Sequence, residues 1–154
     1  ISNAIANTTK SQPPTEGTRM HIGTDLVHIP GLAQQMKLPG STFMQVFTDR
    51  ERRECAAKPD PVTSLAGRWA VKEAYVKAWA STRFGRPPQI APDDFNFAEV
   101  EVVQDAFGRP AVQLHGRAGE VGPPVCSVSI SHDGDYAVAV VAVQMATGAG
   151  RGSL

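Results

Sequence analysis

Hydrophobic and polar residues alternate with a period of two near the N-terminal end of the chain, between residues 20 and 27. This period is typical of a β-strand, because successive side chains of a strand point to opposite faces. We expect the two faces to carry Ile22, Thr24 and Leu26 on one side and Gly23, Asp25 and Val27 on the other. The strand therefore contains one acidic residue, Asp25, in an otherwise apolar setting.

The residues that follow have helical patterns. Residues 29–36 are predicted to form a short helix that ends before Pro39-Gly40. Thr48 and Glu51 are spaced as in a capping box, in which each side chain accepts a hydrogen bond from the backbone N–H of the other residue. They predict the start of a second helix, which continues to about Lys58.

A long helix is predicted from residue 62 to about residue 82, because large apolar side chains recur there at helical spacing. The period then returns to two, and Gly108, which tolerates a positive φ, lies in the predicted turn of a hairpin. The remaining predicted elements are strands 97–103 and 111–114, a weak helix 116–122, and strands 125–130 and 136–143. The last strand is almost continuously apolar, so we expect it at the centre of its sheet. This order predicts an α+β fold with an antiparallel sheet packed against the long helix.

The chain has 154 residues, which suits one compact domain. We expect this domain to span residues 19–145, with a disordered or tag-derived segment at 1–18 and a flexible tail at 146–154. Cys55 and Cys126 lack metal-ligand spacing, so we expect reduced thiols in a cytoplasmic protein, with a single disulfide as the alternative. Since no run of about 18 apolar residues occurs, no membrane partner is expected.

Fifteen basic residues balance fifteen acidic ones, so the formal net charge is zero. Proteins that bind nucleic acid normally carry a basic excess, so nucleic acid is not an expected partner. The charges are unevenly distributed, because residues 49–86 hold nine basic and five acidic side chains, whereas residues 93–105 hold five acidic and no basic ones. The first segment is either a solvated face or a basic patch for a ligand with several phosphates.

Three segments carry side chains with catalytic potential. Asp25, taken alone, is either a structural hydrogen-bonding group or a metal ligand. Glu73 and Lys77 are four residues apart on the long helix, so they are neighbours on one stripe, as an exposed ion pair or as part of a site. His132 is either a turn residue without a ligand or a donor to a phosphate group. The serine and aspartate that flank it cannot complete a catalytic triad with it, because neighbours in an extended chain point apart.

Read together, these segments resemble the 4′-phosphopantetheinyl transferases, and specifically the small holo-acyl-carrier-protein synthase type. The resemblance extends from about His21 to Val143 and follows the order of the family's motifs. The matching motifs are Gly23-Thr24-Asp25-Leu26-Val27, Phe47-Thr48-Asp49-Arg50-Glu51, Arg68-Trp69-Ala70-Val71-Lys72-Glu73-Ala74, Gly108-Arg109-Pro110 and Ser129-Ile130-Ser131-His132-Asp133-Gly134-Asp135. Glu101-Val102-Val103, before the hairpin turn, is similar to actinobacterial members.

The resemblance implies that the protein moves the phosphopantetheine arm of coenzyme A to a serine of apo acyl carrier protein in fatty acid biosynthesis, with release of 3′,5′-ADP. It implies Mg²⁺ as cofactor, held by Asp25 and Glu73, and Mg²⁺ prefers carboxylate, phosphate and water oxygens. Lys77 matches a catalytic lysine that contacts the pyrophosphate. The base for the serine hydroxyl is Glu73 or a water on the metal, and this choice stays open.

The resemblance also assigns residues to coenzyme A binding. They are Arg68, Lys72, Lys77, Gly108, Arg109, Pro110, Ser131 and His132. Val27 stands where larger, two-domain relatives carry a second acid, so a water is expected to take that place on the metal. Together with the chain length, this departure favours the small type and implies a homotrimer with active sites between subunits.

Docking of the acidic carrier protein is a further expectation. Many relatives have arginines in the first helix, whereas this chain has Gln34, Gln35 and Lys37 there. Docking then depends on the arginines of the second helix, which are Arg50, Arg52 and Arg53. The type of carrier, from fatty acid or polyketide synthesis, stays open.

Two other functions remain as alternatives. A metal-dependent phosphodiesterase or nuclease would also use Asp25, Glu73 and a lysine. Nuclease cores usually place the acid and the lysine on one strand, whereas Glu73 and Lys77 are predicted on a helix, and the zero net charge disfavours DNA. A non-catalytic module of the same fold is the second alternative, and the presence of all four polar residues of the motifs, including His132, argues against it.

Overall fold

The computed structural model describes residues 17–146, and most of the two expected tails lies outside this range. Its elements are, in chain order, β1 (Thr18–His28), α1 (Ile29–Lys37), η1 (Phe43–Val46), α2 (Asp49–Ala56), α3 (Pro61–Ser81), η2 (Pro92–Asp94), η3 (Phe97–Glu99), β2 (Val100–Gln104), β3 (Pro110–Leu114), α4 (Gly116–Val121), β4 (Val125–Asp133) and β5 (Tyr136–Ala146). The predicted α+β class and the helix boundaries are confirmed to within a few residues. Both cysteines are free. Within residues 17–146, no helix is long and apolar enough to cross a membrane.

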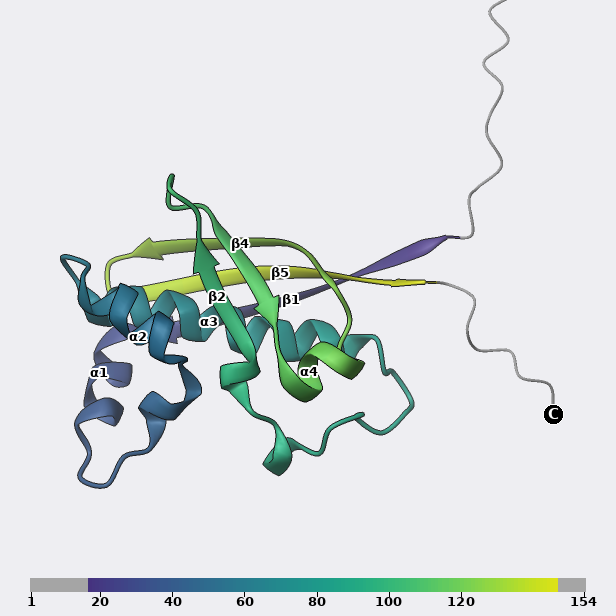
Figure 1. Ribbon diagram of the computed structural model, residues 1–154, viewed down its shortest axis with the longest axis horizontal. Helices are drawn as coiled ribbons and strands as arrows, with labels where there is room; N and C mark the ends of the chain where they lie inside the picture. Colours follow the sequence, from purple (N-terminus) through teal and green to yellow (C-terminus); the bar gives the residue numbers. More distant parts are fainter. Residues whose placement is uncertain (1–16, 147–154) are drawn as a thin grey trace, which may run out of the picture.

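A three-stranded antiparallel sheet with the order β1-β5-β4 forms one layer of the molecule. The apolar strand β5 lies at its centre, as its composition predicts. The long helix α3 packs against one face of this sheet (Figure 1). The two faces of β1 are divided as expected, and the face with Gly23, Asp25 and Val27 is the buried one.

The contact between α3 and β1 depends on small residues. Ala70, Ala74 and Ala78 are fully buried along α3. A Cβ atom added at Gly23 would lie only 1.9 Å from the carbonyl oxygen of Ala74 and 2.5 Å from the backbone nitrogen of Ala78. Glycine therefore lets β1 approach the backbone of α3 more closely than any other residue would allow. This close approach positions the polar side chains next to it on both elements.

The strands β2 and β3 form a separate two-stranded sheet, which differs from the single sheet expected from the sequence. This hairpin crosses the first layer, and its turn projects from the body of the molecule (Figure 1). Gly108 in the turn has a φ of 76°, as predicted. The separation has a physical reason: the free edge of β2 bonds to side chains of α2 and α3 where another strand would lie.

The start of β2 is a second difference from the sequence prediction. Residues 97–99 form a 3₁₀ turn, and the strand begins at Val100. The side chain of Asn96 accepts a hydrogen bond from the backbone N–H of Ala98 (3.1 Å) and so caps this turn. Phe97 packs edge-on against Trp69 and Phe95. Local capping and aromatic packing thus override the alternating pattern.

Candidate active site

Asp25 and Lys77 are brought together by the close packing of β1 on α3. The Lys77 ammonium lies 2.7 Å from Oδ1 of Asp25. Asp25 is nearly buried, with 9% of its surface exposed, whereas the side chain of Lys77 is 58% exposed. The hydrogen bond to Asp25 raises the pKa of Lys77. Lys77 is therefore a cation that reaches from a buried acid towards the surface.

The second oxygen of Asp25, Oδ2, is buried and has no hydrogen-bond partner. Buried carboxylate oxygens are normally paired, so an unpaired one points to a missing cation or ligand. Glu73, one helical turn before Lys77, lies beside it. Burial, reinforced by the neighbouring Asp25 carboxylate, raises the pKa of Glu73 to about 7, although Lys77 acts in the opposite direction. The two carboxylates thus need more positive charge than the single lysine supplies.

These two carboxylates fit a magnesium ion better than a metal that requires an all-protein cage. In residues 17–146, no group of three or more histidine, cysteine or acidic side chains is arranged to hold a metal. Mg²⁺ binds through one or two carboxylates and completes its shell with phosphate oxygens and water. Asp25 and Glu73 form a donor set of this kind, with one oxygen already buried and unpaired. Val27 adds no oxygen ligand, because its side chain is a hydrocarbon, and it is buried in the apolar core.

His132 packs against α3 from the end of β4. A Cβ atom added at Gly67 would lie 2.9 Å from Nε2 of His132, so glycine makes room for the imidazole ring. Both His132 and Ser131 are exposed. They pair with Ala137 and Val138 of β5, and as successive residues of one strand they point to opposite faces. Ser131 and His132 therefore do not act on each other, in agreement with the rejection of a triad.

The hairpin turn holds Arg109 away from the other candidate residues within this chain. Arg109 forms an exposed ion pair with Asp105 (2.6 Å) and stacks over the ring of Phe107. Phe107 is almost fully exposed. The turn thus presents a cation beside an aromatic ring to its surroundings.

Arg68 and Lys72, which the resemblance assigns to coenzyme A binding, are buried and have partners within the protein. Lys72 is completely buried and donates to Glu51, to the carbonyl oxygen of Phe97 (3.0 Å) and to that of Val100 (2.6 Å). These three acceptors use all three ammonium protons. Arg68 is also buried, and it donates to the carbonyl oxygen of Val102 and to a carboxylate of α2. The sequence motif contains both residues, but their partners in the structure are groups of the protein itself.

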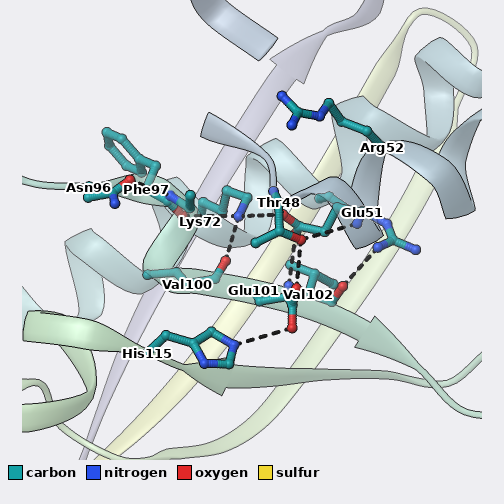
Figure 2. Close-up of polar contacts among 12 residues, drawn as sticks. Thr48, Glu51, Arg52, Lys72, Asn96, Phe97, Val100, Glu101, Val102 and His115 are labelled. Carbon is teal, nitrogen blue, oxygen red and sulfur yellow. Dashed lines mark hydrogen bonds and ion pairs between the residues drawn. The ribbon is translucent and has the colours of Figure 1, made fainter. Parts of the chain in front are cut away.

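The internal partner of Lys72, Glu51, is a polar residue whose importance was missed from the sequence. The capping box was predicted and is present, but Glu51 also accepts from Lys72 (2.9 Å) and from the backbone N–H of Val102 (2.8 Å) (Figure 2). Glu101 is a second missed residue; it accepts from Thr48 (2.6 Å) and contacts His115 (3.2 Å). The sequence did contain a signal for the contact between Glu51 and Lys72. The two residues lie in successive motifs and carry opposite charges, so they could have been expected to pair.

The three arginines of α2 that are expected to dock a carrier protein differ in their surroundings. Arg50 pairs with Glu54 (2.8 Å), and Arg52 pairs with Asp49 and donates to the carbonyl oxygen of Met44 (3.2 Å). Arg53 is exposed. All three lie on α2, which packs beside α3.

A cavity of about 270 Å³ lies along the C-terminal half of α3. It begins one turn beyond Glu73, at Val76, and continues to the arginines after the helix. Its lining is mostly apolar and includes Val76, Trp79, Ala80, Ile90 and Phe95, together with Arg83 and Arg86. Such a lining suits a narrow ligand that has apolar segments and a negatively charged end.

Comparison with known proteins is consistent with this geometry. The family model described as the 4′-phosphopantetheinyl transferase superfamily matches residues 21–141. The chain is 48% identical over 130 residues to a holo-[acyl-carrier-protein] synthase of Nocardia farcinica, and the match covers 82% of this chain and 88% of that one. The synthase of Mycobacterium tuberculosis is 42% identical over 125 residues, covering 80% and 95%. The solved ACPS–CoA complex of Chronobacterium ammoniagenes has a TM-score of 0.75 at 49% identity, covering 82% and 97%.

Proposed function

The chain belongs to the 4′-phosphopantetheinyl transferase superfamily, and on that premise we propose that it transfers the phosphopantetheine arm of coenzyme A to a serine of apo acyl carrier protein, with release of 3′,5′-ADP, in fatty acid biosynthesis. The observation that carries the proposal is the cluster of Asp25, Glu73 and Lys77, with its buried, unpaired carboxylate oxygen. Related structures contain coenzyme A, including that of the Helicobacter pylori synthase.

Asp25 and Glu73 hold Mg²⁺ in this proposal. Bound there, Mg²⁺ supplies positive charge against the pyrophosphate oxygens as the phosphoryl bond breaks. Lys77 contacts the same pyrophosphate, since its ammonium is anchored by Asp25 at one side and exposed at the other. Glu73 is less buried than Asp25, so we assign it to accept the proton of the serine hydroxyl.

The hairpin turn and His132 bind the nucleotide end of coenzyme A in this proposal. Arg109 is exposed, carries a charge suited to phosphate, and lies beside the exposed ring of Phe107, on which an adenine can stack. The apolar cavity beyond Glu73 suits part of the pantetheine arm, which consists of methylene and amide groups. Ser131, on the opposite face of β4 from His132, contacts coenzyme A only if a second copy of the chain completes the site.

A homotrimer with active sites between subunits is therefore part of the proposal. The face of the β1-β5-β4 sheet opposite α3 exposes large apolar side chains, which are Met20, Ile22, Leu26 and Val140. Contiguous exposed apolar patches mark interaction surfaces. Ser131 shares this face with Val140, so burial of the face against identical copies would place Ser131 close to a neighbouring subunit. Sedimentation of the wild-type protein and of Ile22→Lys tests this, and a monomeric wild type would contradict it.

Incubation with apo acyl carrier protein, coenzyme A and Mg²⁺ tests the activity. We expect the carrier to gain the mass of one phosphopantetheine group, and to gain nothing when EDTA replaces Mg²⁺. Absence of transfer to several fatty-acid and polyketide carriers would reject the proposal and leave the non-catalytic alternative. Hydrolysis of coenzyme A without any carrier would instead indicate the phosphodiesterase alternative.

A further inference from the structure

The cavity along the C-terminal half of α3 begins on the same face of the helix as Glu73. Val76, Ala80 and Arg83 follow Glu73 after three, seven and ten residues, and this spacing keeps them on one side of the helix. Arg83 lies two residues beyond the end of α3, and its backbone N–H still donates to the carbonyl oxygen of Ala80 (3.0 Å). A ligand that starts at the Glu73 carboxylate and follows the helix therefore passes through the cavity to Arg83.

The length of this path matches that of the phosphopantetheine arm. A helix rises about 1.5 Å per residue, so the ten residues from Glu73 to Arg83 correspond to about 15 Å. An extended chain advances about 3.4 Å for every three bonds, so the arm, with about thirteen bonds from phosphorus to sulfur, also spans about 15 Å. When the phosphate lies at Glu73 and Lys77, an extended arm brings its sulfur to the level of Arg83.

The walls of the cavity are apolar and are held by specific contacts. The ring of Trp79 packs edge-on against that of Phe95, with 6.0 Å between the centroids. The indole N–H of Trp79 donates to Oε1 of Gln89 (3.0 Å). These contacts join α3 to the segment that follows it. Among the lining residues only Arg83 and Arg86 are charged, so the arm meets a charge only at the far end of the cavity.

These two arginines have no acidic partner in residues 17–146. Arg83 donates through two nitrogens of its guanidinium to the carbonyl oxygen of Pro87 (3.2 Å each), which holds the side chain and leaves other N–H groups free. Arg86 is bonded through its backbone N–H, which donates to the carbonyl oxygen of Arg83 (2.8 Å). The far end of the cavity therefore offers guanidinium N–H groups that suit a carboxylate.

We propose that the enzyme also accepts coenzyme A thioesters whose short acyl group ends in a carboxylate, and that Arg83 and Arg86 recognise this carboxylate. The inference rests on the proposed function, which places the phosphate at Glu73 and Lys77. The serine oxygen of the carrier forms a bond to phosphorus, the bond from phosphorus to the leaving 3′,5′-ADP oxygen breaks, and the serine proton passes to Glu73. The thioester bond stays intact, so the carrier receives the acylated arm in one step.

The test compares malonyl-coenzyme A with butyryl-coenzyme A, whose acyl group has a similar length but no charge. We expect the wild type to use the malonyl donor with a kcat/KM about tenfold higher, because a hydrogen-bonded ion pair forms at the cavity end. The difference should lie mainly in KM, since the carboxylate is far from the reacting phosphorus. The mass gained by the carrier identifies the arm that is transferred.

Arg83→Gln and Arg86→Gln should each remove most of the preference for the malonyl donor, because glutamine keeps polar character but has no charge. Arg117→Gln, the same substitution at an exposed site on α4, is the matched control and should retain the preference. If Arg83→Gln fails to fold, as judged by circular dichroism, Arg86→Gln decides the matter, because the bond from Arg86 to Arg83 involves only backbone atoms.

Three results would overturn the proposal. The first is equal kcat/KM for the two thioesters in the wild type, and the second is transfer from coenzyme A with none from malonyl-coenzyme A. The third is a malonyl preference that persists in both arginine variants, which would place its cause elsewhere. Calorimetric binding of the two thioesters without carrier measures the same preference without turnover. A wild type that prefers the malonyl donor in binding but transfers no arm from any donor would therefore reject the proposed function separately.

Discussion

Two charged clusters lie side by side on α3, and they differ in how completely the protein satisfies them. Lys72 and Glu51 are fully buried, and the ammonium and both carboxylate oxygens have partners. Glu73, the next residue, and Asp25 form the other cluster, which leaves one buried oxygen unpaired and raises the pKa of Glu73. The complete cluster holds the structure together. The incomplete one is the cluster to which the proposed function assigns a cation and a substrate.

The difference follows from the stripe that each residue occupies. Lys72 faces β2, whose free edge supplies carbonyl oxygens. Glu73 lies next to Asp25 of β1, so a like charge adjoins it, and Lys77 is the cation of that cluster. Two adjacent residues on one helix therefore acquire opposite roles. If this account is correct, substitutions in the first cluster affect stability and those in the second affect activity.

The largest expected effect is the loss of transfer when the incomplete cluster loses a charge. Asp25→Asn and Glu73→Gln each remove a ligand for Mg²⁺, and metal stabilisation of the reaction is worth several kcal/mol, so kcat/KM should fall about 10³-fold or more. The free energy of unfolding should be unchanged or higher, because the carboxylates of Asp25 and Glu73 no longer repel each other. Phosphopantetheine transfer followed by mass spectrometry measures the first quantity, and urea denaturation the second. Near-normal activity of either variant would show that the metal site is elsewhere.

The next effect is the loss of stability when the complete cluster is broken. Lys72→Ala leaves the Glu51 carboxylate buried without its cation and strips the carbonyl oxygens of Phe97 and Val100 of their donor. Breaking a buried ion pair in this way costs about 3–5 kcal/mol. Lys58→Ala, at an exposed position, should change the unfolding free energy by about 0.5 kcal/mol at most. Equal midpoints in urea for the two variants would refute the distinction between the clusters.

The sequence was sufficient for the elements of the fold and for the identity of the open cluster. The period of β1, the capping box at Thr48 and the positive φ of Gly108 are local properties, and the structure has all three. That the neighbours Lys72 and Glu73 belong to different clusters was not predictable in the same way. It depends on the edge of a strand about 30 residues further along, whereas the motif alone made Lys72 resemble a ligand for coenzyme A and Glu73 a ligand for the metal.

The separation of the strands into two sheets was missed for a related reason. Alternation predicts strands but not which edges pair, and here charged side chains from two helices take the place of a neighbouring strand. The aromatic contacts of Phe97 likewise link residues that are distant in sequence. In each case the missing information was a tertiary contact.

A smaller effect is expected from Gly23→Ala, which disturbs only the open cluster. The added methyl group would meet the backbone of Ala74 at 1.9 Å, so β1 must move away from α3 and take Asp25 with it. Overpacking of this kind costs about 1–3 kcal/mol. Thr24→Ala, on the exposed face of the same strand, should have little effect. We expect reduced transfer by Gly23→Ala, measured as the carrier's gain of phosphopantetheine mass, with the Glu51–Lys72 cluster intact.

The smallest effect is a pH dependence that distinguishes the clusters without changing their geometry. The pKa of Glu73 is raised from 4.5 to about 7 in the folded protein, so between these values the folded state binds more protons than the unfolded state. Glu73 therefore contributes to the free energy of unfolding of the metal-free protein below pH 4.5, and this contribution is lost as the pH rises to 7. The melting temperature of the wild type should fall over this interval relative to Glu73→Gln, in which the slope from this group is absent. Mg²⁺ should raise the wild-type melting temperature more at pH 8 than at pH 5, because it competes with the proton for the same carboxylates. Parallel melting curves for the wild type and Glu73→Gln at every pH would show that Glu73 is not held next to an unbalanced charge.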